Sequence, residues 1–355
     1  MSKEYHDKLM ITLSDQTDKL VDELPDFAKK FFDNLFNSGM SERTRMQYAH
    51  DMKKFFGYLQ SSAGFKDINM KTLRVDEVLD RINIDDINEY LRSISISLAN
   101  DGSKKPTSPA YKARQVCSLR AFYKYYYRIG AIKNNIYDLI TVPKINEKQI
   151  KRLEKQEVLR LINAIKDTKG LNQSAKTKHD QVEKRDLAII MLFCGTGMRV
   201  SELVGIDLSD IDFNDASLLI ICKGGDQKEV FFNMRVEEAL RDYLFNCRPS
   251  LLNKDNEKEK AFFLSTNGTR LTVSSVQKMI KKYGAAAGLK DKVTPHTLRR
   301  TFGTNLYEET GDIFLVSESL HHKSVETTTR HYVDSSKQHK RKAADIAGSL
   351  FEDDD

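Results

Sequence analysis

The 355-residue sequence contains no tryptophan, only six prolines and only four cysteines. No two cysteines form a Cys-x-x-Cys pair, so the sequence gives no sign of a zinc site or a dithiol redox motif. Disulfides are not expected, and we predict free, buried thiols at Cys117, Cys194, Cys222 and Cys247. No apolar run approaches the roughly 18 residues that a membrane-spanning helix needs, and the N-terminus lacks the basic-then-apolar order of a signal peptide. These absences predict an intracellular, cytoplasmic protein with no membrane partner.

The charge of the chain has little excess of either sign. Lys and Arg number 57 against 51 Asp and Glu, which gives a net charge of +6. This mild excess supports nucleic-acid binding only weakly. The hydrophobic fraction of 40% and the charged fraction of 30% are typical of a globular protein and exclude collagen, coiled-coil rods and mucins. The length predicts two domains, each with its own core.

The first half of the chain predicts helices. Residues 1–20 are polar and are expected to be a flexible lead-in. After Ser41, apolar residues recur every three or four positions from Met46 to Leu59, which predicts an amphipathic helix. Ser108 and Pro109 begin a second helix, whose basic side chains could follow a phosphate backbone or form an ordinary solvated face. These basic residues are Lys112, Arg114, Arg120, Lys124 and Arg128.

The second half combines helices with a short pair of strands. Residues 217–222 and 229–232 are strand-like runs on either side of a Lys-Gly-Gly-Asp turn, which predicts a β-hairpin with lysines near its tip. Residues 167–184 are polar and predict a surface loop. Helices are expected over residues 155–164, 185–194, 201–204, 236–245, 273–287 and 296–310.

A basic, proline-containing stretch separates the two halves and predicts an exposed linker. The domain assignment is a lead-in over residues 1–20, a helical domain over 21–142, a linker over 143–152 and a larger domain over 153–355. The predicted fold class is mainly α, with a small antiparallel β-sheet in the second domain.

Three segments of the second half carry residues suited to phosphate chemistry. Arg199 follows a tight Gly195-Thr-Gly197 turn and precedes a new helix, so it could bind phosphate oxygens or simply pair with Glu202. His296 and Arg299 lie one helical turn apart after the N-cap Thr294 and share one face. Phosphoryl transfer without a metal needs such fixed cations, a nucleophile and a proton donor.

The third segment, residues 320–332, gathers an unusual number of polar side chains. It contains His321 and His322, a run of Ser and Thr, and the sequence Arg330-His331-Tyr332. With His339 these histidines could suggest a metal site, but their spacings of 1, 9 and 8 match no common ligand pattern and no Cys accompanies them. We therefore expect no metal.

Taken in order, GTGMRVSELVGI, the hairpin lysine, PHTLRRTFGT and LHHKSVETTTRHYV resemble the tyrosine recombinase (phage integrase) family, with the style of bacterial Xer-type members. Each motif alone is weak, but the ordered set is specific. The resemblance covers the whole second half, and the first half is similar to that family's helical, SAM-like core-binding domain. It implies a site-specific recombinase that cuts and rejoins DNA strands through a covalent 3′-phosphotyrosine.

The resemblance also implies a role for each matching residue. Arg199 and Arg299 would clamp the scissile phosphate, and Tyr332 would be the nucleophile. His296 would hydrogen-bond the phosphate and help to take the nucleophile's proton, and His322 would donate to a non-bridging oxygen. Lys223 would protonate the leaving 5′ oxygen, with Lys228 on the same hairpin as its rival. No metal or nucleotide cofactor would be needed.

Two positions depart from the family's pattern. His321 stands where glycine is usual, and Arg300 follows the second arginine where histidine is frequent. The histidine side chain at position 321 could crowd the helix junction, or its imidazole could take part in the catalysis. Tyr332 follows His322 by ten residues, a spacing that also occurs in the family.

The resemblance further implies partners. These are a double-stranded DNA recombination site, a tetramer of the chain on DNA and, in some systems, a second recombinase. The C-terminal segment, from Lys337 to Phe351, would form an exchange helix that docks on a neighbouring protomer, or it could fold back on its own domain. The expected tasks include chromosome partition at cell division and DNA integration. Two alternatives are a type IB-like DNA relaxing enzyme and a catalytically silent DNA-binding accessory protein.

Overall fold

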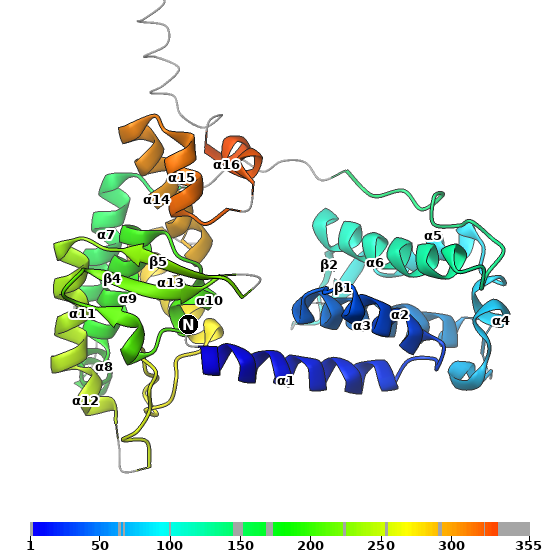
Figure 1. Cartoon of the computed structure of the whole chain (residues 1–355), viewed down its shortest axis with the longest axis horizontal. Helices are drawn as coiled ribbons and strands as arrows, with labels where there is room; N and C mark the ends of the chain where they lie inside the picture. Colours follow the sequence, from blue (N-terminus) through cyan, green and yellow to red (C-terminus); the bar gives the residue numbers. More distant parts are fainter. Residues whose placement is uncertain are drawn as a thin grey trace, which may run out of the picture. The chain divides into compact units, whose positions relative to one another are not determined.

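The structure is a computed structural model that describes residues 3–62, 65–66, 68–98, 101–144, 152–167, 173–222, 225–252, 255–289, 293–322 and 324–332, without the side chains of 173–175, 178, 327 and 330–332. The chain forms two compact units (Figure 1). Asp7–Lys148 form the N-terminal unit, and Met1–His6 with Gln149–Asp355 form the C-terminal unit. The predicted exchange helix lies outside the described residues.

The N-terminal unit is helical, as the fold class predicted, with one small hairpin. Strand β1 (Ile96–Leu98) pairs with β2 (Lys104–Pro106) in antiparallel register, a hairpin that the sequence analysis did not predict. Its helices are α1 (Lys3–Asp22), which belongs to this unit from Asp7 onward, α2 (Ala28–Asn37), α3 (Glu42–Ser61), the 3-10 helix η1 (Met70–Thr72), α4 (Val75–Leu79), α5 (Ile84–Ser93) and α6 (Pro109–Arg128).

The first twenty residues differ from the flexible lead-in that was expected. They belong almost entirely to helix α1, which continues to Asp22. The segment contains no Pro or Gly to break a helix. Thr17 and Val21, four residues apart and so on one face, are buried and give its last turns an anchor.

Aromatic side chains fill the core of the N-terminal unit. Helix α3 buries the predicted face, including Phe55 and Phe56, and α6 buries Phe122 and Tyr126. The rings of Phe31 and Phe122 meet edge to face with 5.0 Å between their centroids. Such pairs add to the free energy gained by burial alone. The predicted amphipathic helices are therefore confirmed in both position and buried face.

A buried carboxylate ties α3 to α6 inside this aromatic core. Asp51 of α3 is 1% exposed and accepts hydrogen bonds from Arg114 Nη1 (2.5 and 2.6 Å), Gln115 Nε2 (2.7 Å) and Ser118 Oγ (2.7 Å) of α6. Gln115 accepts in turn from the Tyr90 hydroxyl (2.9 Å). A charge can be buried at this depth because each of its oxygens has donors.

The C-terminal unit is mostly helical with a small antiparallel sheet, which confirms the predicted fold class. The sheet order is β3-β4-β5, and Ser217 of β4 lies opposite Phe231 of β5, which confirms the predicted hairpin. Its elements are α7 (Lys155–Lys166), α8 (Gln173–Asp180), α9 (Glu183–Thr196), α10 (Val200–Val204), the 3-10 helix η2 (Leu208–Asp210), β3 (Ile211–Asp212), β4 (Ser217–Ile221), β5 (Gln227–Phe231), α11 (Met234–Asn246), α12 (Arg248–Leu251), α13 (Val273–Ala286), α14 (Pro295–Thr310), α15 (Ile313–Ser319) and α16 (Val325–Tyr332).

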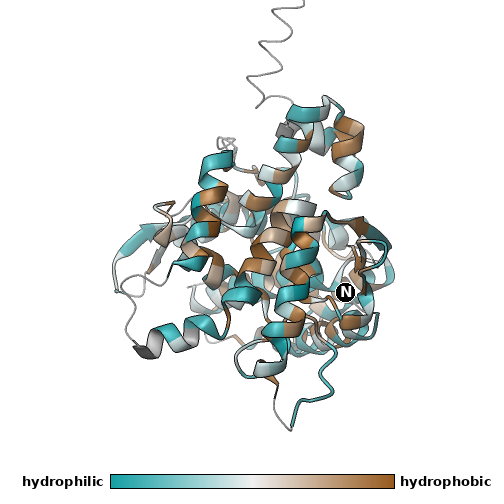
Figure 2. Cartoon of the chain, turned by 90° about the vertical axis from the view of Figure 1, so that its left-hand side faces the viewer, coloured by the Kyte–Doolittle hydropathy of each residue, from teal (hydrophilic) through white to brown (hydrophobic). Residues whose placement is uncertain are grey.

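Helix α9 is the central element of the C-terminal unit. It packs against α7, α11 and α14, and Ile189, Ile190 and Phe193 on its different sides are fully buried. The surrounding helices are amphipathic, and in Figure 2 their brown apolar stripes and teal polar faces alternate around this unit. Because α9 ends at the Gly197 turn, the rigid core delivers the chain directly to Arg199.

Two sequence expectations for these units are wrong. The predicted surface loop over 167–184 contains helix α8 and the start of α9, because the buried His179 packs against Tyr283 with 6.4 Å between ring centroids. All four cysteines lie in the described residues and are free, but Cys117 is exposed and Cys194 only half-buried. Cys117 lies on the solvent side of α6, opposite Val116 and Leu119. Among the described helices, none is both long and apolar enough to cross a membrane.

Candidate active site

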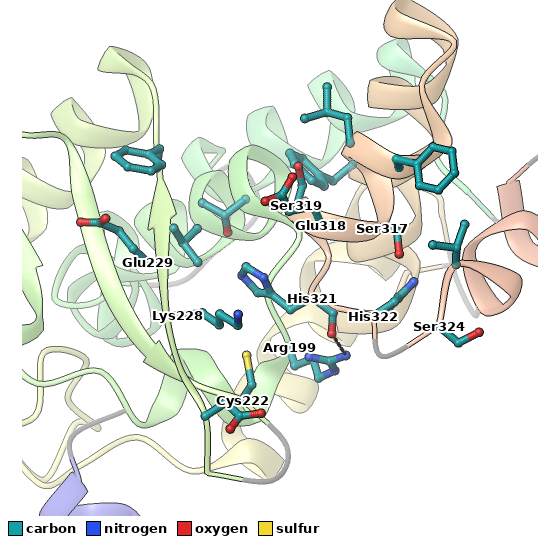
Figure 3. Close-up of a pocket in the computed structure, with 18 residues that line it drawn as sticks. Arg199, Cys222, Lys228, Glu229, Ser317, Glu318, Ser319, His321, His322 and Ser324 are labelled. Atoms are coloured by element: carbon teal, nitrogen blue, oxygen red, sulfur yellow. Dashed lines mark hydrogen bonds between the residues drawn. The ribbon is translucent and has the colours of Figure 1, made fainter.

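A pocket of about 980 Å³ in the C-terminal unit brings together two of the six predicted catalytic residues, the rival lysine of the hairpin and the histidine that departs from the family pattern. Arg199, Lys228, His321 and His322 all line it. Figure 3 shows that they come from three places: the entrance to α10, strand β5, and the turn after α15. The segment that contains α10 and β5 therefore meets the turn after α15, although the two lie far apart in the sequence.

Arg199 is held by a carboxylate and by a backbone carbonyl. It is the N-cap residue of α10, where its N–H donates to Glu202 Oε2 (2.6 Å) and its Nη1 donates to Glu202 Oε1 (2.7 Å). The Arg199 Nη2 also donates to the His321 carbonyl (3.4 Å), drawn as the dashed line in Figure 3. The pairing with Glu202 is thus real, yet the guanidinium still lines the pocket with a third of its side chain exposed.

Arg299 is buried behind the pocket and joins its two sides. Its Nη1 donates to the carbonyl of Gly197 (2.8 Å), and its Nη2 donates to the carbonyl of Leu320. Leu320 and His321 are consecutive, so one turn presents its two carbonyls to the two predicted catalytic arginines. This convergence fixes the spacing of the guanidinium groups.

The histidines occupy different positions around these arginines. His322 lines the pocket, and its Nδ1 lies 2.8 Å from the Thr328 hydroxyl of α16, which fixes the orientation of the ring. His296 lies in the first turn of α14 and is exposed, but it is not among the residues that line the pocket. Of the predicted histidines, only His322 is therefore placed directly in it.

The hairpin supplies the lysine, and α16 supplies the tyrosine. Lys228 of β5 pairs with Ile220 of β4 and lines the pocket. Lys223, the predicted general acid, lies outside the described residues. Tyr332 is the last residue of α16, and its side chain is outside the description. The backbone thus brings α16 beside the pocket through Val325, which is part of the lining.

His321 has the most altered environment of these residues. Its ring is half-buried, and its Nε2 is buried with no hydrogen-bond partner among the described residues. Burial lowers the pKa of His321 from its usual 6.5, and the nearby Glu202 opposes this shift. The positive charges of the two arginines and of Lys228 lower the pKa further, so His321 is neutral near pH 7.

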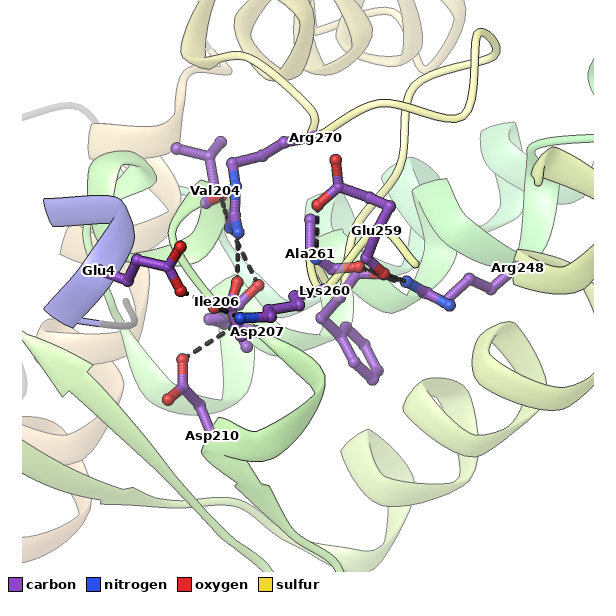
Figure 4. Close-up of polar contacts among 11 residues, drawn as sticks. Glu4, Val204, Ile206, Asp207, Asp210, Arg248, Glu259, Lys260, Ala261 and Arg270 are labelled. Atoms are coloured by element: carbon purple, nitrogen blue, oxygen red, sulfur yellow. Dashed lines mark hydrogen bonds and ion pairs between the residues drawn. The ribbon is translucent and has the colours of Figure 1, made fainter. Parts of the chain in front are cut away.

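A second polar network braces α10 from behind. Arg270 donates from Nη1 to the carbonyl oxygens of Val204 (3.0 Å) and Ile206 (3.3 Å), and its Nη2 pairs with Asp207. Figure 4 shows Arg270 reaching into the cluster formed by these three residues at the end of α10. Because α10 carries Arg199 at its N-cap, this network stabilises the position of the pocket arginine.

Sequence reasoning missed several residues that build the site. The carbonyls of Gly197 and Leu320 have no sequence signature as hydrogen-bond acceptors. Cys222 lines the pocket, and burial raises the pKa of its thiol. Within the described residues, no group of three or more His, Cys, Asp or Glu is placed to hold a metal ion.

Comparisons with known proteins agree with this architecture. Residues 151–339 match the model of the Phage integrase family. Tyrosine recombinase XerC of Caldanaerobacter subterraneus subsp. tengcongensis is 32% identical, over 81% of this chain and 77% of its own length. The corresponding enzyme of Lacticaseibacillus casei is 29% identical, over 81% and 87%.

Solved structures share the fold. The XerH site-specific recombinase bound to a palindromic difH substrate gives a TM-score of 0.63 at 23% identity, covering 87% of this chain and 81% of that one. A lambda integrase tetramer bound to a Holliday junction gives 0.60 at 18% identity, covering 86% and 76%. The fold and the family match together define a DNA strand-cutting and rejoining enzyme. The chain belongs to the phage integrase family and is a site-specific tyrosine recombinase.

Proposed function

We propose that this chain breaks a DNA strand by attack of Tyr332 on the scissile phosphorus, with no metal ion. The observation that carries this proposal is the convergence of Arg199 and Arg299 on the turn at Leu320 and His321, beside the pocket. Two guanidinium groups at fixed spacing can neutralise the charge that develops on the non-bridging oxygens. A metal ion is then unnecessary for charge stabilisation.

The reaction requires two proton transfers. The bond between the Tyr332 oxygen and phosphorus forms while the bond from phosphorus to the 5′ oxygen breaks. His296 takes the phenol proton, and Lys223, or its rival Lys228, protonates the leaving oxygen. His322, oriented by Thr328, donates to a non-bridging oxygen. The covalent 3′-phosphotyrosine keeps the energy of the broken bond, so another 5′-hydroxyl can reseal the strand without a cofactor.

The partner in this proposal is double-stranded DNA, bound by both units. XerH and lambda integrase are solved as DNA complexes, the latter as a tetramer. We extend both properties to this chain: the N-terminal unit is its core-binding domain, and the segment after Tyr332 links protomers. On α3 and α6, Lys54 and Arg114 lie over the Tyr111 ring at 5.0 and 5.1 Å. Because Asp51 compensates the charge of Arg114, Lys54 is the cation of this pair that is suited to a phosphate.

The test is trapping of the covalent intermediate. The purified full-length chain selects bound duplexes from a randomised library, and nicked suicide substrates are built from them. Incubation in EDTA is followed by a denaturing gel and peptide mass mapping. We expect a DNA adduct on Tyr332 that is lost in Tyr332→Phe, with unchanged DNA binding by that variant. Sedimentation of the same complexes measures whether four chains assemble.

Two outcomes would contradict the proposal. An adduct that survives Tyr332→Phe would place the nucleophile elsewhere. DNA binding without any adduct, at a site that a related recombinase cleaves in parallel, would favour the silent DNA-binding alternative. Plasmid relaxation without strand exchange would instead favour the type IB-like alternative.

A further inference from the structure

His321 adopts a backbone conformation that favours glycine. Its φ is +50°, and Ala216 is the other described non-glycine residue with a positive φ. Glycine enters this left-handed region without steric cost, whereas side chains with a Cβ pay for it. A histidine is therefore held here against its own backbone preference, which is a frequent property of functional sites.

The left-handed turn itself has a clear purpose. It presents the carbonyls of Leu320 and His321 to Arg299 and Arg199. Glycine at position 321 would serve that purpose equally well, because both contacts are made by the backbone. The contacts with Arg199 and Arg299 therefore explain the left-handed conformation of residue 321, but they do not explain why its side chain is an imidazole.

The imidazole points into the pocket but not into open solvent. Figure 3 shows the His321 ring turned toward the side of the pocket where Lys228 of β5 lies. The Nε2 atom has no exposed surface and no partner among the described residues. A buried polar atom without a partner is unfavourable. Its burial also keeps Nε2 from contacting a phosphate directly, so its natural partner is a donor from the protein.

The neighbouring charges define what that donor is. Glu202 of α10 offers only acceptors, and the Arg199 guanidinium is already directed at Glu202 and the turn. Lys228 is the remaining cation on the facing strand, and an ammonium has three donors on a flexible stem. A neutral imidazole is a suitable acceptor for it.

We propose that His321 is a positioning residue whose Nε2 accepts a hydrogen bond from the Lys228 ammonium in the DNA-bound enzyme. This contact anchors strand β5 beside the two arginines, and the general acid is then Lys223, the other lysine of the same hairpin. The inference rests on the proposed function, since it concerns the same reaction. It assigns a role to a side chain that the contacts with Arg199 and Arg299 do not explain.

The first test separates proton delivery from folding. His321→Gly relieves the backbone, so we expect thermal stability at or above that of the wild type. Cleavage of an ordinary suicide duplex should slow roughly tenfold, less than the roughly hundredfold or more that loss of the general acid itself would cause, because the lysine is misplaced and not removed. On a duplex with sulfur in place of the bridging 5′ oxygen, the leaving thiolate needs no proton. The variant should therefore cleave this substrate at nearly the wild-type rate.

Further variants test the partner. If Lys228 donates to His321, Lys228→Met and His321→Gly should each slow cleavage, and the double variant should be little slower than either one. His321→Asn keeps an acceptor and tolerates the left-handed region, so partial recovery is expected. Ala216→Gly relieves the same strain outside the pocket and serves as the matched control, with full activity.

Three results would overturn the proposal. They are an unchanged cleavage rate in His321→Gly, a defect that persists on the sulfur substrate, and multiplicative effects in the double variant. Failure of the proposed function is distinguishable, because the wild-type chain would then form no adduct on either substrate.

Discussion

Each unit of the molecule holds an arginine on a buried carboxylate, but the two pairs are built differently. Arg199 pairs with Glu202 in the C-terminal unit, and Arg114 pairs with Asp51 in the N-terminal unit. Both arginine side chains are 32% exposed, and the carboxylates are 2% and 1% exposed. The first pair lies three residues apart in one turn, whereas 63 residues separate the second.

The surroundings of the two pairs indicate different purposes. Backbone carbonyls and a local capping box hold the arginines of the pocket, so their spacing depends on the path of the main chain. Side chains of α6 surround Asp51, so that cluster joins two helices. We therefore expect changes near Arg199 to alter catalysis most, and changes at Asp51 to alter stability most.

The strongest way to break the pocket pair is through the backbone at Gly197. Its φ is +64°, and a Cβ there would lie 2.4 Å from Phe302 Cδ1 and 2.9 Å from Leu320 Cδ2. Gly197→Ala should therefore displace the Leu320 turn and the carbonyl that holds Arg299, abolishing adduct formation and lowering stability by about 3 kcal/mol. Suicide-substrate cleavage and chemical denaturation measure the two effects.

Gly288→Ala is the matched control for that experiment. Gly288 has a similar φ of +72°, but a Cβ there meets nothing within 4 Å. We expect only the backbone penalty, about 1 kcal/mol, with cleavage retained. Equal damage from both substitutions would show that the left-handed conformation matters and that the close approach to Phe302 and Leu320 does not.

Asp51→Ala should break the N-terminal pair with the next largest effect. It removes the charged acceptor of the buried Gln115 and Ser118, which keep only longer bonds, and it leaves Arg114 without its counter-charge. We expect a loss of about 3 kcal/mol in unfolding free energy, moderated because Arg114 can reach solvent. Hydrogen exchange should locate the loss in α3 and α6, with α9 unchanged.

A matched double variant sharpens the interpretation of Asp51. Arg114→Met with Asp51→Asn removes both charges while keeping volume, and it should restore part of the stability. If Asp51→Ala instead destabilised α9 and α10 as strongly as α3, the assignment of this cluster to the N-terminal unit would be wrong.

Glu202→Gln should separate the two pairs most clearly, with a smaller effect on stability. The amide keeps the shape and one acceptor, so unfolding should change by about 1 kcal/mol. The Arg199 guanidinium loses its charged acceptor on Glu202, and misplacement of a phosphate ligand slows cleavage by roughly tenfold to a hundredfold. Single-turnover rates measure this loss, and a variant that cleaves at the wild-type rate would show that Glu202 does not orient Arg199.

The contrast between the pairs also explains what the sequence could predict. Local signals were sufficient for the helices beginning at Ser41 and Ser108, for the β4–β5 hairpin, and for the proposed pairing of Arg199 with Glu202. Each depends on residues within a few positions of one another. The order of these motifs carried the family resemblance, which then implied a role for each site residue.

Contacts between distant segments were beyond reach of the sequence. Asp51 and Arg114 carry no pattern that joins them, and carbonyl acceptors such as Leu320 O have no residue identity to recognise. Helix α8 was missed because its composition is polar, although its described side chains include the buried His179. A polar segment can be ordered by one packed side chain, which hydrophobic periodicity does not detect.

The smallest expected effect is a pH dependence of stability, and it concerns only the surroundings of the Arg199–Glu202 pair. Burial lowers the pKa of His321, beside Arg199, below its unfolded value near 6.5. The unfolded chain therefore binds this proton first as pH falls, so stability from the neutral imidazole is present above pH 6.5 and is lost as pH drops through the lower folded pKa. Within the described part of the chain, Asp51 is hydrogen-bonded to Gln47, Arg114, Gln115 and Ser118, none of which titrates in this pH range.

Between pH 8 and pH 5.5, hydrogen exchange in α10 should accelerate more in the wild type than in His321→Gly. After correction for the pH dependence of the intrinsic exchange rate, the ratio of the α3 exchange rates in the two proteins should stay constant across this range. The difference in α10 should stay below about 1 kcal/mol, because the ring is only half-buried. An identical pH response of α10 in both proteins would mean that protonation of His321 does not contribute to the opening of this helix.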